Sequence, residues 1–387
     1  MDLSETFQSI KDFFAKKTPL PPGLISYQTP PSAPEQYQLH LRTEKDGTGI
    51  LIVNAATVLH LNQTAVEFAY HLIRETEKEK AVEQIAQRYR IDKKQISQDY
   101  DDFVDKVLTL LQTEDLDPVS YLDMERQEPY SGEISAPYRL DCALTYRVGQ
   151  ASHPDHAPTE RVTRELETDE WIIILHKVQN AAIPHIIFTG GEPTLRDDLP
   201  DLIGEAEKLG MVTGLLSDGL RLGDPEYRQA LLLSGLDHLM MIIDPNNLEI
   251  WQILENVLAE DLYTTVHLTL HQGEDLKPYI KRLAELGANS LSLSTIDKDL
   301  SDALQDLRDY AAIQQLDLVW DLPVPYSWNN PVSIELERSE PMKLPKGAGK
   351  AWLYVEPDGD VLPAQGLCEQ ILGNILEDSW EDIWKKT

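Results

Sequence analysis

The chain has 387 residues, of which 42% are hydrophobic and 26% charged, which is enough for more than one domain with a sizeable core. Asp and Glu number 66 against 34 Lys and Arg, so the formal net charge is -32. This charge argues against nucleic-acid and anionic membrane partners and suits a cationic peptide. The two cysteines exclude a disulfide framework, and no apolar run could cross a bilayer, so we expect a cytoplasmic protein.

Residues 1–36 are expected to form an N-terminal helix followed by a proline-rich arm. Prolines cluster at 19–22 and again at 30–34, and such segments act as extended spacers. The helix either docks on its own chain or forms an arm that contacts a partner protein. Its apolar residues recur at helical spacing: Leu3, Phe7, Ile10 and Phe14.

Residues 37–113 read as a compact module of three strands followed by three amphipathic helices. The strand-like runs are 38–41, 50–53 and 57–61, and the first helix is entered through Leu61-Asn62-Gln63-Thr64-Ala65. This order resembles the PqqD-like winged-helix module, the recognition element of systems that modify ribosomal peptides. The alternative is a winged helix that serves only for docking.

The resemblance implies a peptide-binding surface, because in that family a leader peptide adds as a strand beside the third strand and packs against the third helix. An exposed strand edge offers unpaired backbone groups, and the neighbouring side chains select the peptide. The implied residues are Thr57, Val58, Leu59, His60, Phe103 and Val104.

After a polar linker at 114–136, residues 137–340 alternate between strand-like runs and amphipathic helical stretches. Six such βα units predict a parallel sheet with right-handed crossovers, either an open sheet or a partial barrel. The strand-like runs are 138–142, 184–189, 211–217, 238–244, 263–270 and 290–294.

The motif Thr189-Gly190-Gly191-Glu192-Pro193 lies where the second of these strands passes into a helix. Two glycines allow close backbone approach, and Glu192 supplies an anion for an ammonium group. The motif resembles the glycine-glycine-glutamate motif of radical S-adenosylmethionine enzymes, where it receives the amino group of the methionine moiety. This resemblance selects a partial (β/α)6 barrel. It implies a pocket for S-adenosylmethionine formed by Gly190, Gly191, Glu192, Pro193, Ser217 and Asp218. If the motif has only a structural role, this pocket is vestigial.

That family holds a [4Fe–4S] cluster on a C-x3-C-x2-C motif after the first strand. We place Cys142 at the first, vestigial position, with Tyr146 and Gly149 at the other two. Ile242 stands where the family has a serine that contacts S-adenosylmethionine. His153, Asp155 and His156 form either a polar loop or, with Cys142, a zinc site.

Residues 341–387 resemble a truncated SPASM or twitch extension. The turn Pro357-Asp358-Gly359 between two apolar runs predicts a hairpin, and Gly-Asn-Ile at 373–375 matches the family's signature. Ala364 replaces the cysteine that would bind an auxiliary cluster. Cys368 comes four residues later and reads as a lone structural thiol.

The sequence therefore favours a catalytically degenerate radical S-adenosylmethionine-like protein, a pseudoenzyme that acts as a peptide- or protein-binding subunit or as a structural subunit of a larger complex. We expect no cofactor and no resident metal, with no [4Fe–4S] cluster and S-adenosylmethionine bound at most without cleavage. One alternative is an active peptide maturase with unusual cluster ligation, for example by cysteines of a second chain. Another is a cluster-free S-adenosylmethionine-binding regulator.

Overall fold

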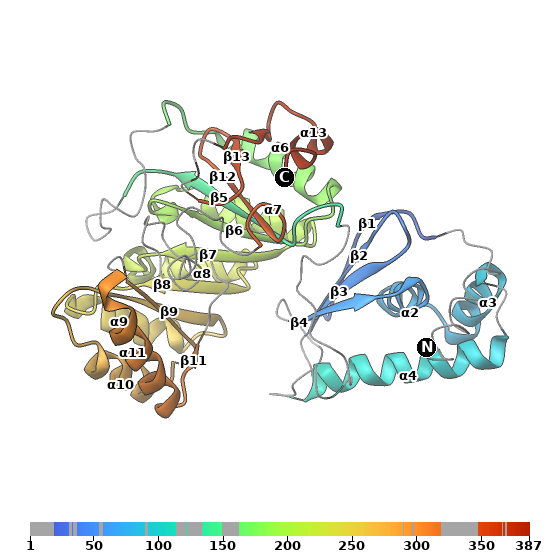
Figure 1. Ribbon diagram of the computed structural model, residues 1–387, viewed down its shortest axis with the longest axis horizontal. Helices are drawn as coiled ribbons and strands as arrows, with labels where there is room; N and C mark the ends of the chain where they lie inside the picture. The colour runs from blue at the N-terminus through green and yellow to red at the C-terminus, as the bar shows by residue number, and fades with distance from the viewer. Residues whose placement is uncertain are drawn as a thin grey trace. The chain divides into compact units, whose positions relative to one another are not determined.

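The computed structural model describes residues 19–30, 33, 37–53, 57–89, 92–113, 121, 134–148, 162–288, 290–295, 298–318, 347–365, 367 and 370–387. The chain divides into two compact units, residues 1–135 and residues 136–387 (Figure 1). Each unit has its own hydrophobic core. The predicted helix at 1–16 lies outside the described residues.

The first unit is an antiparallel sheet in the order β1-β2-β3-β4, followed by three helices. Leu39, Leu51 and Leu59 project from neighbouring strands into one core with Val66 of α2 and Val107 of α4. The bounds are β1 (Gly23–Gln28), β2 (Gln38–Thr43), β3 (Gly49–Val53), β4 (Thr57–Leu61), α2 (Gln63–Ile73), α3 (Lys78–Tyr89) and α4 (Lys93–Gln112).

Side-chain caps begin two of these helices. Asn62 accepts a hydrogen bond from the Ala65 backbone N–H at the start of α2, and Asp92 does the same for Lys94 at the start of α4. Such caps satisfy backbone donors that the first helical turn leaves unpaired. The order of three strands and three helices after residue 37 agrees with the sequence pattern.

Strand β1 lies within the predicted proline-rich arm and was not anticipated. It pairs antiparallel with β2, from Gly23 opposite Thr43 to Gln28 opposite Gln38. Ile25 and Tyr27 are partly buried against the core of this unit. The flanking prolines suggested an extended spacer, but the segment between them alternates and so fits a strand at the sheet edge, where prolines are tolerated.

The second unit alternates strands and helices, which confirms the predicted α/β class. Strands β5 to β11 are parallel neighbours in sequence order. The elements are β5 (Arg139–Thr145), α6 (Thr168–Asn180), β6 (His185–Gly190), η2 (Pro193–Leu195), α7 (Leu199–Lys208), β7 (Val212–Ser217), η3 (Leu220–Gly223), α8 (Pro225–Leu233), β8 (His238–Ile242), α9 (Leu248–Leu258), β9 (Tyr263–Leu270), α10 (Lys277–Glu285), β10 (Ser290–Thr295), η4 (Lys298–Leu300), α11 (Ser301–Ile313) and β11 (Asp317–Leu318).

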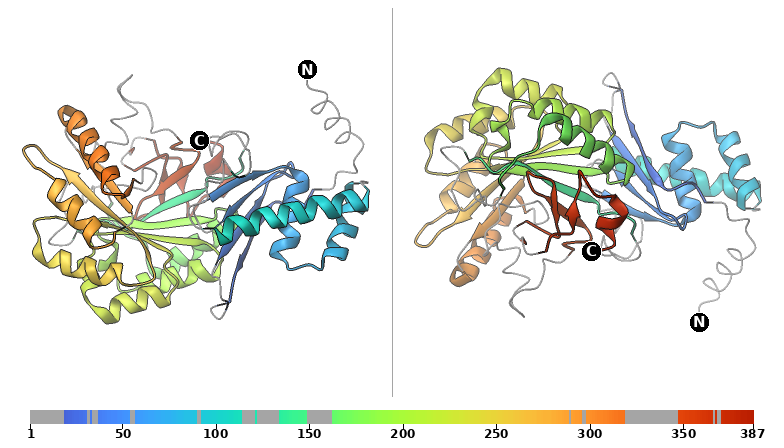
Figure 2. Two further views of the ribbon diagram at one scale, coloured as in Figure 1. Left: turned by 90° about the horizontal axis from the view of Figure 1, so that it is seen from below. Right: turned by 90° about the horizontal axis from the view of Figure 1, so that it is seen from above.

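The two faces of this sheet differ in what covers them. One face packs against the helices in a large core that includes Trp171 of α6 and Trp251 of α9 (Figure 2). On the other face, Ile187, Leu216 and Met240 form a small apolar cluster, and Ile242 packs against it. Consecutive strand residues therefore point alternately to the helices and to the opposite face, as the pleat requires.

The C-terminal tail extends the same sheet beyond β5. Strand β12 (Trp352–Val355) runs parallel to β5, and β13 (Asp360–Leu362) turns back antiparallel to β12. Gly359 has φ +92°, a conformation that glycine adopts without strain, so the predicted hairpin is confirmed. A short strand β14 (Gly373–Asn374) and helix α13 (Trp380–Trp384) complete the tail. Among the described helices, none is both long and apolar enough to span a bilayer.

Candidate functional site

The end of β6 lies very close to the end of β5, and both glycines of the motif make this approach feasible. A Cβ on Gly190 would lie 2.1 Å from the Thr145 carbonyl oxygen, and one on Gly191 would lie 2.1 Å from that of Arg147. The Gly191 N–H donates to Thr145 O at 2.7 Å, and the Glu192 N–H donates to Arg147 O at 2.8 Å. The two glycines therefore have a packing role in this chain.

Glu192 is buried at the carboxyl end of the sheet, and its carboxylate joins the ends of β6 and β7. One carboxylate oxygen accepts hydrogen bonds from Ser217 Oγ at 2.8 Å and from Thr194 Oγ1, while the other accepts the Asp218 N–H at 2.7 Å. Ser217 in turn accepts the Gly219 N–H at 3.0 Å. The structure thus brings the predicted residues 190–193, 217 and 218 together.

The electrostatics of this group suit a cation. Burial and the neighbouring charge of Asp218 raise the pKa of Glu192 to about 7, although hydrogen bonds from Asp218 and Thr194 oppose the shift. Asp218 and Gly191 remain partly exposed beside it. A bound ammonium group would relieve the repulsion between the two carboxylates, so the residues present fit the amino group of an amino-acid ligand.

Cys142 lies inside β5, not at its end, which corrects the predicted strand boundary. The strand continues to Thr145, and the Cys142 side chain is fully buried in the core shared with the helices. Burial raises the pKa of its thiol well above the usual value. Ala143, Leu144 and Thr145 carry no turn signal, so the strand continues past Cys142 to Thr145.

The other positions assigned to the cluster have structural contacts or are not described. The buried Tyr146 hydroxyl donates to Glu356 at 2.8 Å and lies 3.3 Å from the Tyr354 hydroxyl, so it joins β5 to the tail. Ile242 packs against the small apolar cluster of the sheet, and Ala364 is buried after β13. Outside the described residues lie Gly149, His153, Asp155, His156 and Cys368.

Two residues that sequence reasoning missed hold the end of β5 and Tyr146, which follows it. Glu165 accepts hydrogen bonds from Thr145 Oγ1 at 2.6 Å and from the Tyr146 N–H at 2.9 Å. The Arg196 guanidinium, buried, donates to the Leu144 and Leu166 carbonyl oxygens. Their partners are distant in sequence, so no local pattern could have identified either residue.

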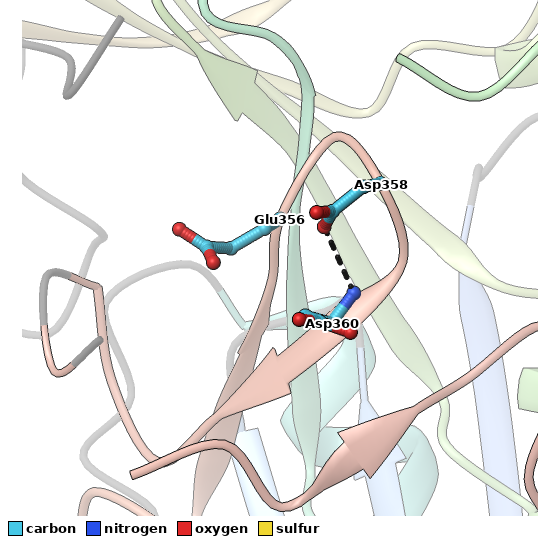
Figure 3. A group of neighbouring side chains, drawn as sticks. All are labelled: Glu356, Asp358 and Asp360. Carbon is cyan, nitrogen blue, oxygen red and sulfur yellow. Dashed lines mark hydrogen bonds between the residues drawn. The ribbon is translucent and has the colours of Figure 1, made fainter. Parts of the chain in front are cut away.

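Three carboxylates of the β12–β13 hairpin lie within 4.8 Å of one another: Glu356, Asp358 and Asp360 (Figure 3). Oxygen ligands of this kind suit a hard cation such as Ca²⁺. Internal donors already serve them, however. Tyr146 donates to Glu356, the Asp360 N–H to Asp358, and Asn374 Nδ2 to Asp360. The group therefore has a sufficient structural role in closing the hairpin.

The edge strand β4 and helix α4 carry the predicted peptide-binding residues, which fall into two sets. Leu59 and Phe103 share the core between the sheet and the helices, and Val104 packs against the neighbouring cluster formed with α3. By strand alternation, Val58 and His60 point to the opposite face. Within the described part of the chain, β4 pairs only with β3, so its outer edge is open to another strand.

Residues 49–109 match the family described as "Coenzyme PQQ synthesis protein D (PqqD)". A "PqqA peptide cyclase" of Streptomyces rochei is 26% identical over 280 residues, which cover 65% of this chain and 76% of that protein. The protein of the same name from Methylorubrum populi is 25% identical over 292 residues, covering 66% and 73%.

Solved structures show the same fold. Streptococcus suis SuiB bound to its precursor peptide SuiA superposes with a TM-score of 0.55 at 13% identity, covering 89% of this chain and 86% of that one. SuiB bound to S-adenosylmethionine gives the same score over 93% and 88%. The chain is thus similar in sequence to PqqA peptide cyclases and in fold to SuiB, and residues 49–109 are similar to PqqD.

These comparisons show that the predicted absence of cofactors is wrong. The relatives are named PqqA peptide cyclases, and SuiB, a structure with this fold, contains bound S-adenosylmethionine. The prediction relied on the positions where Tyr146, Gly149, Ile242 and Ala364 replace contacts of the family, and it gave less weight to the retained Gly190-Gly191-Glu192 motif.

Proposed function

We propose that this chain is a peptide-modifying protein of the radical S-adenosylmethionine type that recruits its substrate through the PqqD domain. The observation that carries the proposal is that one chain holds both features: an open strand edge in the PqqD domain, and an α/β unit with a buried acidic group at the carboxyl ends of its strands. In this proposal the first unit is a winged helix, residues 137–340 form a partial (β/α)6 barrel and the tail is a twitch-like extension.

The peptide would add as a strand beside β4 and pack against the C-terminal half of α4. Unpaired backbone groups of an edge strand give affinity, and side chains near the edge give selectivity. Thr57, Leu59, Phe103 and Val104 would contact the helix-facing side chains of the peptide. Val58 and His60 would contact those that point to the other face.

S-adenosylmethionine would be held by Gly190, Gly191, Glu192, Pro193, Ser217 and Asp218. Glu192 and Asp218 would receive its ammonium group, which fits the raised pKa of Glu192. When reduced by a cluster, this cofactor supplies radical chemistry. The chain's own residues bind and orient it, and Ser217 keeps the Glu192 carboxylate in place.

The residues of this chain do not by themselves fit a cluster held by three thiolates. The whole sequence has two cysteines, no cysteine lies between Thr145 and α6, and Cys142 is enclosed by the core. We therefore derive no step through a cluster on this chain alone. In the enzymatic form of the proposal, thiolates of a second chain complete the site.

A pull-down from the native cells tests the peptide-binding step. The tagged full chain is purified, and bound peptides are identified by mass spectrometry. Val104→Asp places a charge at the proposed contact and should release the peptides. Gln98→Asp adds the same charge on an exposed part of α4 and should retain them. Equal peptide recovery from both variants would contradict recruitment through this surface.

The burial of Cys142 favours a second candidate, a peptide-binding subunit that does not itself catalyse the modification. The test is anaerobic reconstitution of the natively purified complex, with iron and sulfide measured in wild type and in Cys142→Ala. Product formation with a cluster that survives the substitution supports an enzyme with external ligands. Peptide binding without modified product supports the subunit. Calorimetric binding of S-adenosylmethionine that Glu192→Ala abolishes, without cleavage, indicates a regulator.

A further inference from the structure

The PqqD-containing unit has a pocket of about 270 Å³ at the sheet edge opposite to β4. It lies between β1, β2, the end of α2 and the first half of α4. Strands β1 and β4 are the two edges of the sheet, so the pocket is separate from the proposed peptide strand. Its volume is slightly below the usual range for small-molecule sites, and it suits a single side chain.

Aromatic rings and a carboxylate form the walls of this pocket. The rings of Tyr27 and Tyr37 have centroids 5.8 Å apart, and Tyr100 contributes a third ring from α4. The Tyr27 hydroxyl donates to Glu75 Oε1 at 3.2 Å, which holds the carboxylate at the pocket. Ring faces carry negative potential, and together with a carboxylate they attract an organic cation. None of the described lining residues is a lysine or an arginine.

Glu75 occupies a backbone position that usually favours glycine. It follows α2 with φ +48°, in the left-handed region, and its N–H donates to Leu72 O. A residue with a side chain adopts this conformation at a cost in free energy. Glycine would end the helix without this cost but would remove the carboxylate from the pocket.

His71 adds an uncharged ring to the wall of the pocket. Its ring lines the pocket and is 2% exposed, and Nδ1 lies 3.2 Å from Thr76 Oγ1. Nε2 is buried without a hydrogen bond. Burial and the charge of Arg88 lower the pKa of His71 to about 4, so the ring is neutral near pH 7 and adds no positive charge.

We propose that this pocket binds one guanidinium or ammonium group, carried by a basic side chain of a peptide. The three rings would surround the cation, and Glu75 would neutralise its charge. The chain's net charge of -32 attracts such a ligand at long range. The inference rests on the proposed function only in that a peptide supplies the cation.

Calorimetry on the full chain with N-acetyl-arginine amide and N-acetyl-lysine amide tests the proposal. We expect saturable binding of at least one of them and at least tenfold weaker binding of N-acetyl-citrulline amide, which is nearly the same shape but uncharged. Glu75→Gly should also reduce the affinity at least tenfold while leaving the fold intact, because glycine suits this backbone. Glu79→Gln, an exposed acid of α3, should change nothing.

Equal binding of the arginine and citrulline derivatives would overturn the proposal, as would unchanged affinity in Glu75→Gly. Binding of free arginine but not of the capped derivative would overturn the assignment to a peptide side chain. The capped derivatives cannot form a strand, so their binding does not depend on β4. The result of the calorimetry at this pocket is therefore independent of the result of the Val104→Asp pull-down.

Discussion

Replacing Gly191 by alanine should separate the ends of β5 and β6, whose close contact positions Glu192. The added Cβ would lie 2.1 Å from Arg147 O, and the two segments would have to separate by about 1 Å to reach the 3.0 Å that real Cβ contacts keep. That separation would break the hydrogen bonds from Gly191 and Glu192 to Thr145 and Arg147. Overpacking and two lost backbone hydrogen bonds together cost about 3 kcal/mol or more.

Urea unfolding, followed by far-ultraviolet circular dichroism and tryptophan fluorescence, measures this loss. Calorimetry with S-adenosylmethionine should show weaker binding, because Glu192 is displaced with the backbone. Gly204→Ala is the matched control. A Cβ there would meet nothing closer than 3.8 Å, and alanine should stabilise helix α7 by about 0.5–1 kcal/mol. If Gly191→Ala is as stable as wild type and binds the ligand equally, the packing role of this glycine is refuted.

Three further predictions concern buried or partly buried polar groups, each measured as the difference in unfolding free energy between variant and wild type. Because the pKa of Glu192 is raised, the unfolding free energy of the wild type should fall by up to about 3 kcal/mol as pH rises from 4.5 to 7. Glu192→Gln should remove this fall. Burial lowers the pKa of His238 to about 4, so the neutral ring contributes at most about 3 kcal/mol to the unfolding free energy. This contribution should disappear as pH falls from 6.5 to 4, and His238→Gln should not show this pH-dependent loss. Tyr146→Phe should cost about 1–3 kcal/mol, because Glu356 loses its phenol donor; no change would refute that role.

Features that depend on residues near one another in the sequence were predicted correctly. Alternating apolar runs and amphipathic stretches indicated the α/β unit, since each pattern depends on the strand or helix period alone. Pro357-Asp358-Gly359 indicated the hairpin because only a tight turn needs such residues. The spacing of Gly190, Gly191 and Glu192 likewise located the end of β6.

Only the tertiary structure decided which groups meet. Ser217 and Asp218 reach Glu192 because parallel strands β6 and β7 end at the same edge, and Cys142 is enclosed because β5 continues for three residues beyond it. The pocket beside Glu75 combines β1, α2 and α4, and β1 itself was hidden between prolines. Contacts between distant segments depend on sheet order and side-chain packing, and neither leaves a local signal in the sequence.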